Sequence, residues 1–120
     1  MNSVITWFEI PAHDFDRATQ FYERSFALSL KREEMDAIAM AVFPHDEGQT
    51  GGAVVHGAPY QPTDNGVCIY LYTDEFDTVL QRIEQNGGKI LMPRTSIGPN
   101  GFIALFNDSE GNRIGLHTNP

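Results

Sequence analysis

The feature that most constrains this chain is an internal repeat, because its two halves run through the same order of predicted elements. Each half reads as one strand, one amphipathic helix and then three further strands. An offset of 61 residues aligns four positions of the predicted helices, which are Phe15 with Phe76, Asp16 with Asp77, Ala18 with Val79 and Tyr22 with Ile83. Each half alone is too small to bury both faces of a sheet, so we expect the halves to pack together.

Hydrophobic periodicity and turn residues set the expected elements of the first half. These are a strand at 4–10, a helix at 15–26 behind the N-cap Asp14, a hairpin of strands at 27–34 and 37–43, and a short strand at 53–55. Residues 57–66 hold two glycines and two prolines, which is typical of a linker.

The same signals return in the second half. They predict a strand at 67–72, a helix from Phe76 with Asp74 as N-cap, a strand at 89–92 stopped by Pro93, a loop at 94–101, and strands at 102–106 and 112–118. The helix is expected to end at Asn86-Gly87-Gly88, because glycine adopts the left-handed conformation that closes helices.

Charge and cysteine content exclude several classes of protein. The chain has 16 acidic and 8 basic residues, a formal net charge of −8, and no cluster of Lys or Arg. A nucleic-acid partner or an anionic membrane surface requires a basic face, so neither is expected. The single cysteine, Cys68, cannot form an internal disulfide, and the first residues do not resemble a signal peptide. We therefore expect a cytoplasmic protein.

Three segments resemble the motifs of one superfamily. They are residues 7–26 (WFEIPAHDFDRATQFYERSF), 74–93 (DEFDTVLQRIEQNGGKILMP) and 101–116 (GFIALFNDSEGNRIGL), where Ser109 stands in place of the usual proline. Together they cover most of the chain, and the last, a closing hairpin, is the most specific. The chain resembles the vicinal oxygen chelate superfamily of glyoxalases, bleomycin-resistance proteins and extradiol dioxygenases.

This resemblance implies an α+β fold in which two βαβββ modules form a cupped, eight-stranded mixed sheet, with helices outside and a ligand cavity inside. A single domain over 1–120 is expected, with one module at about 3–56, the linker at 57–66 and the other module at about 67–118. The resemblance also implies a homodimer. It does not specify a reaction, because one fold carries many functions.

Members of this superfamily that catalyse reactions usually hold one divalent metal through inward-facing His, Gln or Glu side chains. Here the first-strand position falls on Trp7, the second-module position on about Val67 and the last-strand position on Gly115. None of these side chains can donate an electron pair to a metal. The fourth position lies within residues 51–56, and its register stays open. We therefore expect no metal cofactor of the usual kind.

Three functions remain open, and so does the question of whether the chain is an enzyme. The first is metal-independent binding of a small organic ligand, lined by Trp7, Glu9, Tyr70, Tyr72, Arg94 and His117, with Tyr60 as a further aromatic candidate. The second is a lyase, isomerase or dioxygenase of the glyoxalase type with zinc or nickel at a displaced site formed by Glu9, His56 and His117. The third is a protein-association domain, which an apolar helix surface would favour.

Overall fold

Strand, helix and three strands follow one another twice within residues 3–120, which the computed structural model describes. The first unit comprises β1 (Trp7–Pro11), α1 (Phe15–Phe26), β2 (Lys31–Met35), β3 (Ile38–Val42) and β4 (Gly51–His56). The second comprises β5 (Tyr70–Tyr72), α2 (Phe76–Gln85), β6 (Lys89–Ser96), the short 3-10 helix η1 (Gly98–Asn100), β7 (Phe102–Asn107) and β8 (Arg113–Thr118). This order confirms the predicted α+β fold.

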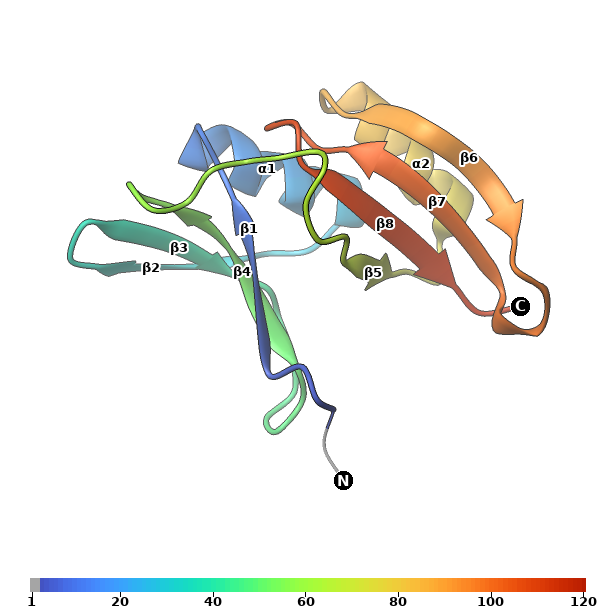
Figure 1. Ribbon diagram of the computed structural model, residues 1–120, viewed down its shortest axis with the longest axis horizontal. Helices are drawn as coiled ribbons and strands as arrows, with labels where there is room; N and C mark the ends of the chain where they lie inside the picture. Colours follow the sequence, from blue (N-terminus) through green and yellow to red (C-terminus); the bar gives the residue numbers. More distant parts are fainter. Residues whose placement is uncertain (1–2) are drawn as a thin grey trace.

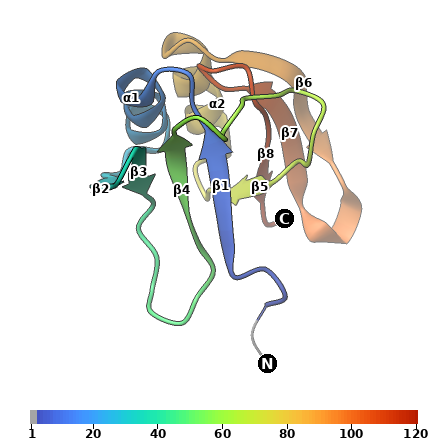
Figure 2. The ribbon, with the colours of Figure 1, turned by 60° about the vertical axis from the view of Figure 1, so that its left-hand side comes forward.

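The strands form two four-stranded mixed sheets with equivalent orders, β1-β4-β3-β2 and β5-β8-β7-β6. In each sheet the first strand of the unit lies at an edge and runs parallel to the last. The sheets splay apart beneath the helices like the sides of a cup, with β1 and β5 as the facing edges (Figures 1 and 2). The cupped arrangement was predicted, although no hydrogen-bonded ladder joins the two sheets within the described residues.

A shared hydrophobic core holds the two units together on the helix side of the sheets. Phe21 on α1 packs against Phe106 on β7, with ring centroids 6.2 Å apart. Ile10 and Val54 from the first sheet and Leu116 from the second are buried in the same cluster. The helices present their apolar stripes to this core, since every fully exposed residue on α1 and α2 is polar. The helix surfaces therefore do not favour the predicted association function.

Both units fasten the start of their helix with the same side-chain arrangement. An arginine on the second strand pairs with an aspartate in the first helical turn and lies over the ring of the preceding phenylalanine. The contacts join Arg32 to Asp16 (2.6 Å) and Phe15 (5.3 Å to the centroid), and Arg94 to Asp77 (2.8 Å) and Phe76 (5.7 Å). The repeat seen in the sequence thus extends to tertiary contacts.

Several predicted strand limits are wrong because pairing partners decide them. The strand expected at 4–10 begins at Trp7, since its neighbour β4 begins at Gly51. The strand expected at 67–72 is reduced to Tyr70–Tyr72. Residues 27–30 lie outside β2, because Ala27 adopts a left-handed conformation (φ 53°) that ends α1.

Two further predictions in the second unit are corrected. Pro93 does not stop β6, which continues to Ser96 with irregular pairing around the proline. An edge strand tolerates proline because its outer N–H groups need no partner. The N-cap of α2 is Glu75 and not Asp74, and it makes no side-chain capping bond. In α1, by contrast, Asp14 accepts the Arg17 backbone N–H as predicted.

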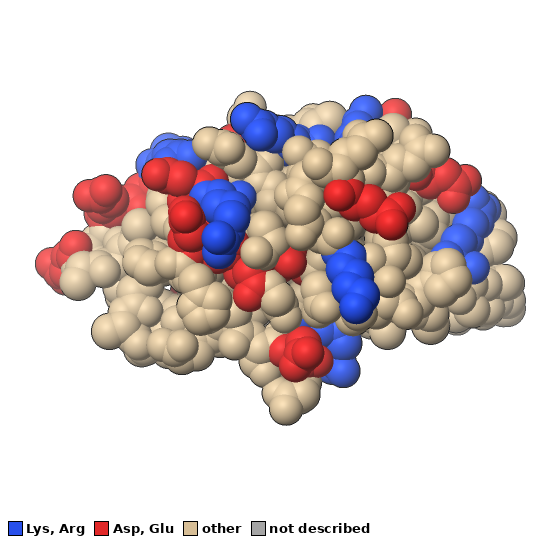
Figure 3. All heavy atoms as spheres, turned by 90° about the horizontal axis from the view of Figure 1, so that it is seen from above, with Lys and Arg blue, Asp and Glu red and all other residues tan. Residues whose placement is uncertain are grey.

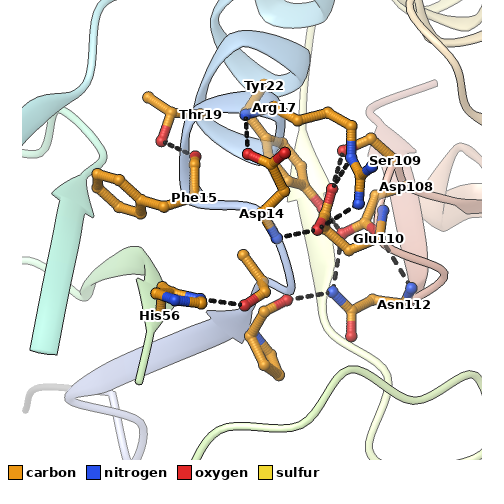
Figure 4. A network of polar contacts seen from close by, with 12 residues as sticks. Asp14, Phe15, Arg17, Thr19, Tyr22, His56, Asp108, Ser109, Glu110 and Asn112 are labelled. Atoms are coloured by element: carbon orange, nitrogen blue, oxygen red, sulfur yellow. Dashed lines mark hydrogen bonds and ion pairs between the residues drawn. The ribbon is translucent and has the colours of Figure 1, made fainter. Parts of the chain in front are cut away.

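The turn between β7 and β8 is fastened to α1 by a buried polar network (Figure 4). The Tyr22 hydroxyl donates to Asp108 Oδ2 at 2.6 Å, and the backbone N–H groups of Glu110 and Asn112 donate to Asp108 Oδ1. Burial raises the pKa of Asp108, although these hydrogen bonds oppose the effect. Burial beside Asp108 also raises the pKa of Tyr22 well above its usual value.

The neighbouring residues extend this network to the start of α1 and the end of β1. Glu110 accepts hydrogen bonds from Arg17 Nε and from the Asp14 backbone N–H, both at 2.7 Å. Burial alone would raise the pKa of Glu110, but the hydrogen bonds from Arg17, Asp14 and Ser109 outweigh it, and the pKa is lowered. The Asn112 amide donates to Pro11 O at 2.7 Å. The second unit is thereby tied to the first through the buried side chains of Glu110 and Asn112.

We predict that Asp108→Asn lowers the free energy of unfolding by about 2–3 kcal/mol, because an amide NH₂ would then face groups that donate to the carboxylate. Tyr22→Phe removes a single donor and should cost less. Urea denaturation of both variants measures the difference. A neutral effect of Asp108→Asn would contradict the structural role of the network.

Replacement of Glu110 tests the same network through pH. A carboxylate with a lowered folded-state pKa contributes stability above its unfolded-state pKa, about 4.3, and loses it as the pH falls through the folded-state pKa. Glu110→Gln should therefore be most destabilising near neutral pH and less so below about pH 4. The opposite contribution of Asp108 is present in both proteins and largely cancels. The control is Glu84→Gln, which makes the same substitution at an exposed position of α2. An equal pH trend in both variants would contradict a specific role of Glu110.

Candidate functional site

A cavity of about 350 Å³ lies in the seam between the two units. Its walls come from β1, from the connection between β4 and β5, and from the beginning of β8. The apolar lining is Ile5, Trp7, Phe8, Ile10, Pro11, Val67, Ile69 and Ile114, and the polar lining is Glu9, Thr63, Asn112 and Arg113. A mostly apolar cavity of this size with a few polar groups is typical of a small-molecule site.

Strand alternation on β1 brings Trp7 and Glu9 together. Ile10 points into the core, so Trp7 and Glu9 lie on the more exposed side of the strand. The indole Nε1 donates to Glu9 Oε2 at 3.3 Å, and the His45 ring meets the indole edge-on at a centroid distance of 6.3 Å. These contacts orient the indole beside the carboxylate, while 39% of Trp7 remains exposed.

Tyr60 approaches the same carboxylate from the connection between the units. The negative charge of Glu9 raises the pKa of the Tyr60 phenol, with smaller contributions from burial and from a hydrogen bond to Glu9. The phenol therefore stays protonated at neutral pH and can act as a donor. Glu9 thus has an indole N–H and a phenol as neighbours.

The other polar side chains of the cavity wall are engaged with the protein. The Asn112 amide donates to Pro11 O and Asp108, and its oxygen accepts the Thr63 backbone N–H. Arg113 Nη2 donates to Gly66 O at 2.8 Å. These contacts fix the connection against the beginning of β8. The buried network around Asp108 therefore also supports one wall of the cavity.

A second cavity of about 340 Å³ lies on the other side of β1, between β4 and β5. Tyr70 and Tyr72 contribute to its lining, together with His45 and Gly51. The Tyr70 ring occupies the space that a side chain at Gly115 would need, and a Cβ atom at Gly51 would lie 2.9 Å from the His45 ring. Aromatic rings thus fill the space above both glycines.

The remaining predicted ligand-binding residues lie apart from Trp7 and Glu9. His117 Nε2 contacts Asn100 O at 2.8 Å, and its ring meets Tyr72 edge-on. Arg94 is held by Asp77 and lies over the Phe102 ring at 4.1 Å, beside the start of α2. The structure brings Trp7, Glu9 and Tyr60 together, and it gathers Tyr70, Tyr72 and His117 at another place.

The expected metal-ligand positions do not fit a divalent metal. In the first unit, Trp7 lies beside Gly51 in the pairing of β1 with β4. On the last strand the position is Gly115, and Val67 is 93% exposed outside β5. Trp7, Val67 and Gly115 supply no side-chain lone pair for coordination. Cys68 carries a thiol next to Val67, but Sγ is directed to Ile69 O at 3.8 Å.

The displaced set of Glu9, His56 and His117 is also not assembled. His56 lies at the end of β4 with Nδ1 2.8 Å from Ala12 O, whereas His117 belongs to the other sheet. Within residues 3–120, no group of three or more His, Cys, Asp or Glu side chains has metal-binding geometry.

Two residues at the site were missed by sequence reasoning. His45 was not among the predicted ligand-binding residues, yet it contacts Trp7 and covers Gly51. The adjacent Gly51-Gly52 pair is the signal that a ring approaches this strand closely. Asn112 was considered only as part of the closing hairpin, and its contact with Pro11 depends on residues 101 positions apart.

Charged side chains are spread over helices and strands, whereas the exposed large apolar residues lie outside the helices. Seen from above, the molecule carries acidic and basic groups interspersed over its helix side (Figure 3). The exposed large apolar residues lie on strands and connections, and they are Val4, Ile5, Trp7, Met35, Val67, Tyr70, Tyr72, Leu91 and Ile97. No helix among residues 3–120 has the length and apolar character needed to cross a bilayer.

Comparisons with known proteins agree on one family. Residues 4–116 match the family model described as Glyoxalase/Bleomycin resistance protein/Dioxygenase superfamily. A glyoxylase-like domain-containing protein of Didymella fabae is 29% identical over 131 residues, covering 100% of this chain and 97% of the relative.

Solved structures show the same fold. A glyoxylase/bleomycin resistance protein/dioxygenase domain from Frankia sp. EAN1pec superposes with a TM-score of 0.75 at 15% identity, covering 100% of this chain and 94% of that one. Glyoxalase I from Zea mays superposes with a TM-score of 0.69 at 22% identity, covering 93% of this chain and 44% of that one.

We predict that Gly115→Ala displaces the Tyr70 ring and costs about 1–2 kcal/mol of stability, because the added methyl group overlaps the ring. In a Tyr70→Ala background the same substitution should cost less. A double-mutant cycle measured by thermal unfolding checks this coupling. Additive effects would show that the ring does not require glycine at position 115.

Proposed function

This chain belongs to the glyoxalase/bleomycin resistance protein/dioxygenase superfamily, and we propose that it binds a small organic ligand in the seam cavity without a divalent metal. The observation that carries this proposal is the chemistry of the positions at which the family resemblance implies metal ligands. Positions expected to coordinate a metal hold Trp7 and Gly115, while Trp7 forms a cavity wall beside Glu9. The site binds its ligand through the shape of the cavity, the Trp7 ring face and the Glu9 carboxylate.

The distribution of apolar side chains favours a ligand in the seam cavity over a protein partner that binds the helices. The exposed residues of α1 and α2 are polar, whereas the cavity wall is rich in apolar side chains. Homodimer formation and a cytoplasmic location stay predictions from the family resemblance and from the sequence. Sequestration or sensing of the ligand requires no further catalytic group.

A screen on the full-length chain tests the proposal. The protein contains a single tryptophan, so its indole N–H gives one resonance that reports on the cavity. We expect flat aromatic compounds to shift this resonance, and treatment of the protein with a chelator to leave their affinity unchanged. Trp7→Ala should weaken binding of the hits about tenfold when measured by calorimetry, because a stacking surface is lost.

The matched control is Leu91→Ala, which removes another exposed apolar side chain on β6 outside the seam cavity. Its affinity for the hits should equal that of the unmodified protein. Binding that disappears with the chelator and returns with zinc or nickel would contradict the proposal. Equal losses in Trp7→Ala and Leu91→Ala would do so as well.

A further inference from the structure

The ligand class follows from which polar groups of the seam cavity remain available. The Asn112 amide donates to Pro11 O and Asp108, and Arg113 donates through Nη2 to Gly66 O and forms no ion pair with Glu9 among the described residues. The Thr63 hydroxyl donates to Asn65 at 2.6 Å. Among the described lining residues, this leaves Glu9 as the one charged side chain with acceptor capacity to spare, because a carboxylate has about four acceptor positions.

Glu9 accepts from a donor that does not neutralise it, the indole Nε1 of Trp7 at 3.3 Å. The Tyr60 phenol is a further uncharged neighbour, whose pKa the Glu9 charge raises. No Lys or Arg forms an ion pair with Glu9 within residues 3–120. A neutral or anionic ligand that excluded water here would leave this carboxylate without a counter-charge, which is costly.

Trp7 supplies the second half of the recognition. Its indole Nε1 donates a hydrogen bond to the carboxylate, and the His45 ring contacts the indole edge-on. Trp7 therefore presents an oriented aromatic surface next to a negative charge. A ring face attracts cations, and a carboxylate forms short hydrogen bonds with cationic N–H donors. The cavity of about 350 Å³ accommodates a molecule of one or two rings.

We propose that the ligand of this cavity is a flat aromatic cation with N–H donors, such as an aryl amidinium, which pairs with Glu9 and packs against Trp7. The proposal rests on the proposed function. The formal net charge of −8 also favours approach of a cation over that of an anion.

Three probes of nearly equal shape test this inference, which are benzamidinium, benzamide and benzoate. Each is titrated into the full-length ¹⁵N-labelled protein, and the Trp7 indole N–H resonance is followed. We expect benzamidinium to bind about tenfold or more tightly than benzamide, and benzoate most weakly, since only the amidinium makes charge-assisted bonds with Glu9. In Glu9→Gln, which keeps the Trp7 reporter, amidinium and amide should bind equally.

Glu84→Gln removes the same charge from an exposed position at the end of α2 and should keep the preference for the cation. Equal affinity of the amidinium and the amide for the unmodified protein would overturn the cation proposal while leaving ligand binding in the seam intact. Loss of the preference in both variants would show that net charge is responsible, and would also overturn it. The cation proposal would also be overturned if none of the three probes shifted the Trp7 indole resonance. The compound screen tests the proposed function separately.

Discussion

The arrangement of the two units depends on one buried constraint, the attachment of the β7–β8 turn to the start of α1. Asp108 and Glu110 are buried carboxylates that accept hydrogen bonds from Tyr22, Arg17 and backbone N–H groups of both units. A buried acidic group without such partners would be strongly destabilising, so the turn has one favourable position. The position of the turn also fixes one wall of the cavity, because Asn112 belongs to the turn and lines the cavity.

The residues that hold the two units together differ from Trp7 and Glu9, the residues that give the cavity its chemistry. The closing hairpin and the helices form the framework, whereas Trp7 and Glu9 lie on the more exposed side of β1. At the expected metal-ligand positions, Trp7 faces the cavity, and Gly115 leaves room for the Tyr70 ring. Side chains without chelating groups at these positions are the basis of our proposal that the cavity binds an organic ligand and no metal.

Local signals predicted the parts of the fold that local interactions decide. The limits of α1, its N-cap Asp14 and the repeated order of elements could be read from the sequence. Long-range pairing decided the rest. Continuation of β6 through Pro93 depends on its position at a sheet edge, and the shortness of β5 depends on how residues 63–69 meet β8. At the site, the candidate residues Trp7 and Glu9 contact each other, but no sequence rule placed Arg94 against Phe102.

The central claim is that the seam holds an organic ligand between Trp7 and the Glu9 carboxylate, with no coordinating ion. A crystal structure of the protein with a compound identified through the tryptophan resonance, using diffraction data collected at the zinc and nickel absorption edges, tests this most directly. The account predicts ligand density against the indole and the carboxylate, without an anomalous peak in the cavity. An anomalous peak coordinated by the ligand, or a ligand bound elsewhere on the chain, would contradict it.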